Sequence, residues 1–100
     1  MINVTYAAPE RGEHILSVRG HAGYSEAGSD IVCAGVSALV YACAAALRKA
    51  CADPHLEDNG DTVTIHVHGE NNAEHTDGIF AATVSGLELL AEEYPQHVTF

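Results

Sequence analysis

A cysteine and a histidine lie 12 residues apart where a glycine-containing loop runs into an apolar stretch of the chain. The histidine, His21, belongs to the loop, and the cysteine, Cys33, stands near the start of the apolar stretch. If that stretch is a helix, its first turn has unpaired N–H groups and a partial positive charge, which lower the pKa of a thiol placed there. A histidine on a loop that folds back can then act as the base. The spacing therefore predicts a nucleophile–base pair of Cys33 and His21.

Two polar side chains close to the pair are candidates to support it. Asp30 either caps the helix or orients the ring of His21 and stabilises its charged form. Both interpretations stay open, because a carboxylate has enough lone pairs for both roles. Ser37 lies one turn beyond Cys33 on the same helix face, where its hydroxyl either reaches the site or bonds to a carbonyl of its own helix.

Backbone groups near the pair also have expected roles. The N–H group of Cys33 or Ala34 could form an oxyanion hole for the carbonyl under attack. Gly23 and Gly28 lie in the loop, and we expect them to serve as hinges when it opens for a peptide and closes over it.

The elements that must position these groups are a loop at residues 20–29 and a helix that begins at residue 31, with an apolar run to residue 47, and that contains all three cysteines. The loop contains three glycines and has no regular hydrophobic period. Ser29 or Asp30 is a suitable N-cap, and Asp53-Pro54 is expected to stop the helix. The helix is apolar on all sides except for Ser37 and the tip of Tyr41.

A helix that is apolar all round is buried on more than one face or crosses a membrane. A membrane span needs about 20 strongly apolar residues. Because this run is shorter and rich in alanine and glycine, we exclude a membrane segment. We expect the sheet to cover one side of the helix and a second helix or a partner subunit to cover the other, which suggests a homodimer.

Three other stretches, residues 1–7, 13–19 and 62–68, alternate apolar and polar side chains and are predicted to be half-buried strands. The first two are expected to pair as a hairpin, and a short final strand is expected at residues 97–100. Residues 55–60 are interpreted as an acidic turn that ends in Asn-Gly.

A second helix is predicted from a cap at Thr76 or Asp77 to a stop at Pro95, with an apolar stripe led by Phe80 and Leu87. The element order is then β-β-α-β-α-β. It predicts an α+β fold, a two-layer sandwich with both helices on one face of a mainly antiparallel or mixed four-stranded sheet.

The composition bounds the class of protein. One hundred residues are enough for one small core, so residues 1–100 are expected to form a single domain. The net charge of −10 makes nucleic acid an unsuitable partner and a basic protein or peptide a suitable one. No basic start precedes an apolar segment, so a cytoplasmic location is expected. The three cysteines are expected to be free thiols spaced along one helix: Cys33, Cys43 and Cys51.

A rival constellation is His66 and His68, which alternation places on the same strand face. Imidazole suits zinc or copper, and three acidic or imidazole groups lie nearby in the sequence: Glu70, His75 and Asp77. No third ligand has a convincing spacing, and the two histidines share the polar face of the strand with threonines. The sequence therefore predicts no specific metal site and no cofactor.

The stretch from Gly20 to Ser37 resembles the signature of the bacterial ribosomal-processing cysteine protease family. The family pairs His-Ala on the loop with Gly-x-Asp-Ile-Val-Cys-Ala and a serine four residues after the cysteine. These motifs are matched here by His21-Ala22, Gly28, residues 30–34 and Ser37. The resemblance extends over the whole chain in length and element order, and its specific part lies between His21 and Ser37.

This resemblance implies a dimeric cytosolic endopeptidase with Cys33 as nucleophile and His21 as base. It implies that the substrate is a large-subunit ribosomal protein, which loses a short N-terminal extension at a cut near a pair of aromatic residues. The alternative hypothesis is a non-catalytic dimeric interaction or metal-binding module that uses His66 and His68.

Overall fold

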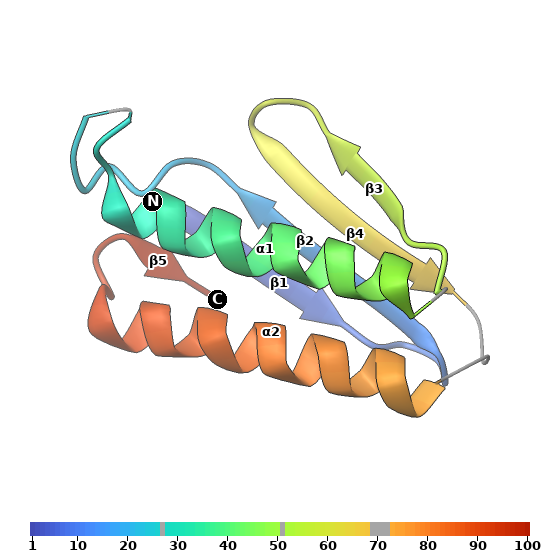
Figure 1. Cartoon of the computed structure of the whole chain (residues 1–100). Helices are drawn as coiled ribbons and strands as arrows, with labels where there is room; N and C mark the ends of the chain where they lie inside the picture. The colour runs from blue at the N-terminus through green and yellow to red at the C-terminus, as the bar shows by residue number, and fades with distance from the viewer. Residues whose placement is uncertain (27, 51, 69–72) are drawn as a thin grey trace.

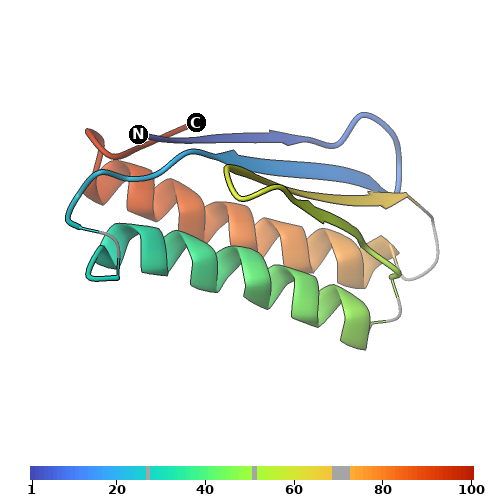
Figure 2. The ribbon, with the colours of Figure 1, turned by 90° about the horizontal axis from the view of Figure 1, so that it is seen from above.

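A five-stranded sheet is covered on one face by two helices in the computed structural model of the chain (Figures 1 and 2). The elements are β1 (Ile2–Ala7), β2 (Glu13–Arg19), α1 (Ile31–Lys49), β3 (His55–Asp58), β4 (Thr62–His68), α2 (Ala73–Glu93) and β5 (Val98–Thr99). The structure describes residues 1–26, 28–50, 52–68 and 73–100. The predicted α+β fold, with two layers and both helices on one face, is confirmed.

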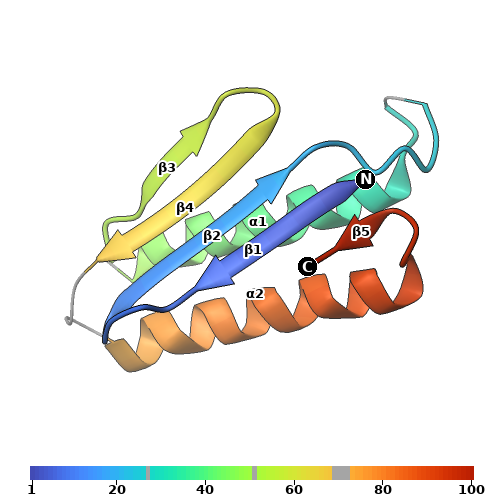
Figure 3. The same cartoon turned by 180° about the vertical axis from the view of Figure 1, so that it is seen from behind.

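The sheet is mixed. Its strand order is β3-β4-β2-β1-β5, with β5 parallel to β1 and every other neighbouring pair antiparallel. Figure 3 shows β1 lying between β2 and β5, with both chain ends near one end of the sheet. The predicted hairpin of the first two strands is confirmed, with Val4 opposite Val18.

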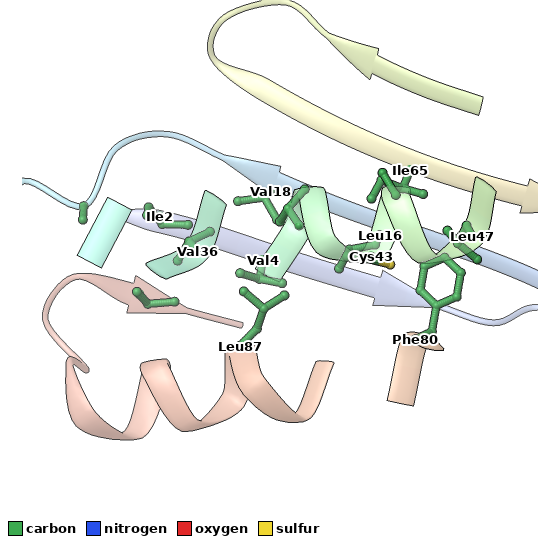
Figure 4. Close-up of a cluster of buried hydrophobic side chains, with 14 of the residues drawn as sticks. Ile2, Val4, Leu16, Val18, Val36, Cys43, Leu47, Ile65, Phe80 and Leu87 are labelled. Carbon is green, nitrogen blue, oxygen red and sulfur yellow. The ribbon is translucent and has the colours of Figure 1, made fainter. Parts of the chain in front are cut away.

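The core lies between the sheet and the helices, where alternate strand residues meet the apolar sides of α1 and α2 (Figure 4). Each fully buried Leu, Ile or Phe side chain stabilises the fold by about 1.5–3 kcal/mol. The side chains labelled in Figure 4 are Ile2, Val4, Leu16, Val18 and Ile65 from the sheet, Val36, Cys43 and Leu47 from α1, and Phe80 and Leu87 from α2.

The prediction of four strands was wrong, because residues 55–58 form the edge strand β3 rather than part of a turn. This strand pairs with β4 and is largely exposed, so it has no apolar alternation to reveal it. The turn is made by residues 59–61, and the Asn59 side chain accepts the N–H groups of Asp61 at 3.0 Å and Thr62 at 2.8 Å. The observed order is therefore β-β-α-β-β-α-β.

Both helices differ from expectation at one end. Helix α1 ends at Lys49 with Ala50 as its C-cap, before the predicted stop at Asp53-Pro54. Cys51, which was predicted to belong to this helix, lies outside the described residues. Helix α2 is already formed at Ala73, so neither Thr76 nor Asp77 is its cap. Thr76 is instead buried against the core, and Asp77 binds a histidine of the sheet.

The two helices run in opposite directions and pack closely side by side (Figures 1 and 2). A Cβ atom on Gly86 of α2 would lie only 2.9 Å from Cδ2 of Leu39 in α1, so glycine permits this close approach. The sheet and α2 thus cover two sides of α1. This matches the expected arrangement in which a second helix, rather than a partner subunit, packs beside α1. By length and composition α1 could also cross a membrane, but six of its residues are buried in this core.

Candidate active site

Asp30 builds the start of α1. Its Oδ1 accepts the N–H groups of Val32 and Cys33, both at 3.0 Å, which makes Asp30 rather than Ser29 the N-cap. Its Oδ2 accepts the N–H groups of Tyr24 at 3.0 Å and Ser25 at 3.3 Å. The Cys33 N–H, followed by the other three backbone donors, holds the pKa of Asp30 below its usual range. Asp30 therefore caps the helix and ties the loop to it, and its role in orienting His21 stays a prediction.

Cys33 occupies the first turn of α1, as the sequence predicts, and its side chain is half-buried. The backbone N–H of Ala22 donates to its Sγ at 3.2 Å. Because Ala22 follows His21 directly, this bond brings the histidine-bearing loop back onto the cysteine. A backbone N–H in this position is a donor that a thiolate can accept during the reaction.

His21 and Cys33 line the same two cavities. The smaller, of about 260 Å³, lies between α1 and the sheet and has an apolar wall that includes Val36, Val40 and Val63. The other, of about 420 Å³, lies between the loop and the start of α1. The pair thus stands between two recesses, an arrangement that can hold a chain on both sides of a bond.

The remaining predicted residues gather around the second cavity. Ser37 is exposed and lines both cavities with Cys33, and Ala34 lines the second. Gly23 and Gly28 also line it and have left-handed backbone, with φ of 66° and 91°, which residues with side chains rarely adopt. Their hinge role stays a prediction.

The predicted oxyanion hole stays a prediction, and both N–H groups proposed for it already have partners in this structure. The N–H of Cys33 donates to the Asp30 side chain, and the N–H of Ala34 donates to the Asp30 carbonyl at 3.0 Å. The first bond belongs to the cap and the second to the helix itself, so forming the helix start uses both donors.

Sequence reasoning missed the acidic rim of the smaller cavity, which is formed by Asp58 and Asp61 near the tip of the β3–β4 hairpin. The Tyr41 hydroxyl donates to Asp58 at 2.6 Å and so ties α1 to this hairpin. This hydrogen bond raises the pKa of Tyr41 and lowers that of Asp58. The acidic run was visible in the sequence, but without β3 nothing indicated that it folds over Cys33.

The rival histidines face polar neighbours. His66 bonds Glu13 at 3.0 Å, and His68 lies 3.9 Å from Glu10. Asp77, which was considered with them, bonds His14 instead, and Glu70 lies outside the described residues. Among the residues that the structure describes, no three His, Cys, Asp or Glu groups are arranged to hold a metal ion.

An apolar groove of about 490 Å³ lies between α1 and α2. It contains Cys43, which is 2% exposed and whose pKa is raised by burial, an effect that a hydrogen bond with Thr83 opposes. A buried thiol of this kind is a poor nucleophile. The chemistry therefore points to Cys33.

Comparison with known proteins also indicates a cysteine protease. The profile of the family described as cysteine protease Prp matches residues 1–99. The ribosomal processing cysteine protease Prp of Staphylococcus aureus (strain Mu50) is 34% identical over 102 residues, which cover 98% of this chain and 95% of that protein.

Two solved structures of an essential ribosomal processing protease Prp from S. aureus are similar over 99% of this chain and 96% of theirs. The one in complex with a covalently linked product peptide has a TM-score of 0.88 and 29% identity. The one in complex with a substrate peptide has a TM-score of 0.81 and 28% identity.

Proposed function

The chain belongs to the cysteine protease Prp family and is a cysteine-type peptidase, and we propose that it removes a short N-terminal extension from a large-subunit ribosomal protein. The observation that carries the catalytic assignment is the hydrogen bond from the N–H of Ala22 to Sγ of Cys33, which joins the loop of His21 to the helix start. Cys33 is the nucleophile and His21 the base.

The reaction follows the chemistry of a thiolate and an imidazole. His21 takes the proton of the Cys33 thiol, and Sγ attacks the scissile carbonyl carbon to form a tetrahedral adduct. The C–N bond then breaks as protonated His21 gives its proton to the leaving amine, which leaves a thioester on Cys33. His21 next removes a proton from water, which attacks the thioester and releases the new carboxylate and the free thiol.

The two cavities support the substrate class. The apolar wall of the smaller cavity suits an aromatic side chain beside the cut, in line with the aromatic pair implied by the family resemblance. Asp58 and Asp61 on its rim, together with the net charge of −10, favour a basic substrate over nucleic acid.

Cys33→Ala and His21→Ala test the assignment. Each is expected to abolish release of the extension from the ribosomal protein, measured by mass spectrometry, because each removes a reacting group. Matched controls are Cys43→Ala and the exposed His55→Ala, which should retain cleavage at temperatures where they are folded. Circular dichroism checks the fold of all four variants, and retained cleavage in folded Cys33→Ala would refute the mechanism.

We also propose that the chain is a cytoplasmic homodimer. The exposed apolar side chains Ile31 and Tyr41 of α1 and Leu89 of α2 support a partner surface on the helix layer. Sedimentation at micromolar concentration tests the assembly, and a monomer there would contradict it.

A further inference from the structure

We propose that His97 is a positioning residue for the catalytic pair, because it holds the peptide segment whose N–H faces the sulfur of Cys33. The proposal rests on the proposed function of Cys33 and His21. Nδ1 of His97 lies 2.9 Å from the carbonyl oxygen of Ala22. Since a carbonyl only accepts, Nδ1 carries the proton and donates it to this bond.

Ala22 is thereby held at both of its peptide groups. Its carbonyl accepts from His97, its N–H donates to Sγ of Cys33 at 3.2 Å, and its side chain is 2% exposed. The preceding carbonyl, that of His21, accepts a hydrogen bond from the backbone nitrogen of Met1 at 2.5 Å. The backbone of the segment that carries His21 is thus fixed at three backbone groups, the His21 carbonyl and the Ala22 N–H and carbonyl.

His97 can act as an anchor because its own backbone is fixed. Its carbonyl accepts the N–H of Ile2 at 2.8 Å, and its N–H donates to Tyr94 at 2.9 Å. These bonds lie just before β5, which pairs with β1 in the sheet. His97 therefore attaches the loop to the sheet, in addition to the contacts that attach the loop to α1.

The ring of His97 makes a second contact with the same loop. The Tyr24 ring packs edge-on against it, with centroids 5.3 Å apart and an interplanar angle of 80°. Tyr24 also packs edge-on against Tyr94 at 5.5 Å. Replacing the imidazole with another flat ring can therefore preserve the packing while removing only the donor.

Loss of the donor should release the Ala22 carbonyl and let the Ala22–Gly23 peptide group shift. A Cβ on Gly23 would meet open space, so this peptide has room to move, while the Asp30 bonds to Tyr24 and Ser25 still hold the rest of the loop. The hydrogen bond from the Ala22 N–H to Sγ of Cys33 would then form less often, and the thiolate would lose a donor. Nδ1 donates in both the Nδ1-protonated neutral ring and the charged ring, so the contact survives protonation of His97.

The decisive comparison is His97→Phe against His97→Asn. Phenylalanine keeps a ring against Tyr24 without a donor, whereas the side-chain N–H of asparagine occupies nearly the position of Nδ1. Alkylation of Cys33 by iodoacetamide, followed by peptide mass spectrometry at several pH values, measures the reactivity of the sulfur without any substrate. Cleavage of the ribosomal protein gives kcat and KM separately.

For His97→Phe we expect alkylation at neutral pH and kcat to fall about tenfold, the size of one hydrogen bond, with KM little changed. The alkylation profile should move to higher pH. His97→Asn should restore most of both rates. His55→Phe, at an exposed histidine, is the matched control and should behave like the wild type.

Wild-type alkylation and kcat in His97→Phe would overturn the proposal. Equal losses in the Phe and Asn variants would also overturn it, because packing rather than the donor would then matter. If His97→Phe does not fold, His97→Ala takes its place in the comparison with His97→Asn. A loss of Cys33 alkylation in His97→Phe that is restored in His97→Asn supports the proposal. It does so even if the wild type cleaves no ribosomal protein, because that result would refute only the proposed function.

Discussion

The cysteines of α1 differ in their surroundings although they share one helix. Cys33 lies half-buried in the first turn and accepts the N–H of Ala22, whereas Cys43 is buried and its pKa is raised by that burial. Burial of a thiol disfavours its ionised and reactive form. Reactivity on this helix is therefore decided by position along it.

We expect a mild alkylating agent near neutral pH to label the native protein at Cys33 well before Cys43. Peptide mapping by mass spectrometry measures the order, and denaturation should make both sites reactive. His21→Ala should slow labelling of Cys33. Labelling of Cys43 first would mean that the start of the helix does not activate the thiol.

Asp30 stabilises the loop and the helix start mainly in its charged form. Its pKa is lowered in the fold from 3.8, so its contribution to stability is present above the unfolded value of about 3.9 and is lost as pH falls through the lowered folded value. Asparagine can cap the helix through its oxygen, but its NH₂ group cannot accept the N–H groups of Tyr24 and Ser25.

Asp30→Asn is therefore expected to be less stable than the wild type at pH 7 and to approach it below about pH 4. Urea unfolding between pH 7 and pH 2 measures the difference. A difference that stays constant over this range would show that charge is not the cause. The same variant should alkylate more slowly at Cys33, and faster alkylation would mean that repulsion between the carboxylate and the thiolate dominates.

At the scale of elements, a buried histidine joins both hairpin strands to α2. His14 of β2 is 5% exposed, and its ring stacks on Phe80 at 4.4 Å. Its Nε2 bonds Asp77 of α2 and its Nδ1 bonds Tyr6 of β1, both at 2.7 Å. Since a carboxylate only accepts, Nε2 carries the proton, and in the neutral ring the Tyr6 hydroxyl donates to Nδ1. Burial, followed by the charge of Asp77, raises the pKa of Tyr6.

His14→Phe is expected to lower the free energy of unfolding by about 1–3 kcal/mol, because the ring packing remains while the Tyr6 hydroxyl loses its partner. His14→Ala should cost more, since it also removes the stacking on Phe80. Urea unfolding measures both. Cleavage by the folded variants should match the wild type, because this network lies at the opposite end of the helix layer from Cys33 (Figure 1). If His14→Phe has the same free energy of unfolding as the wild type, this hydrogen-bond network does not contribute to stability.

At the scale of the molecule, 14 acidic residues against 4 lysines and arginines give a strongly negative surface. Part of it stands at the proposed substrate cavity, where Asp61 is largely exposed and pairs with Arg19 at 3.4 Å. Attraction between exposed charges is screened over about 30 Å at 0.01 M salt and about 8 Å at 0.15 M.

For a basic substrate, kcat/KM is expected to fall as salt rises over this range, because steering weakens. Initial cleavage rates at several salt concentrations measure the slope, and a neutral peptide with the same cut sequence is the control. Asp61→Asn should reduce the slope. A flat profile for the basic substrate would mean that the acidic surface serves solubility alone.

Local patterns were sufficient for most of the fold and for the catalytic hypothesis. Period-two alternation located β1, β2 and β4, and the loop–helix motif located the start of α1 with Cys33 in its first turn. The side-chain period of a strand or helix and the cap of a helix are set by residues close in the chain, so spacing reports them directly.

Tertiary packing decided the rest. β3 exists only through its pairing with β4. The loop folds back so that Tyr24 and Ser25 donate to Asp30, and the N–H groups of Cys33 and Ala34 have partners at the helix start. His97 meets Ala22 across 75 residues of sequence. Contacts of this kind depend on the register and packing of distant elements, and no local period encodes them.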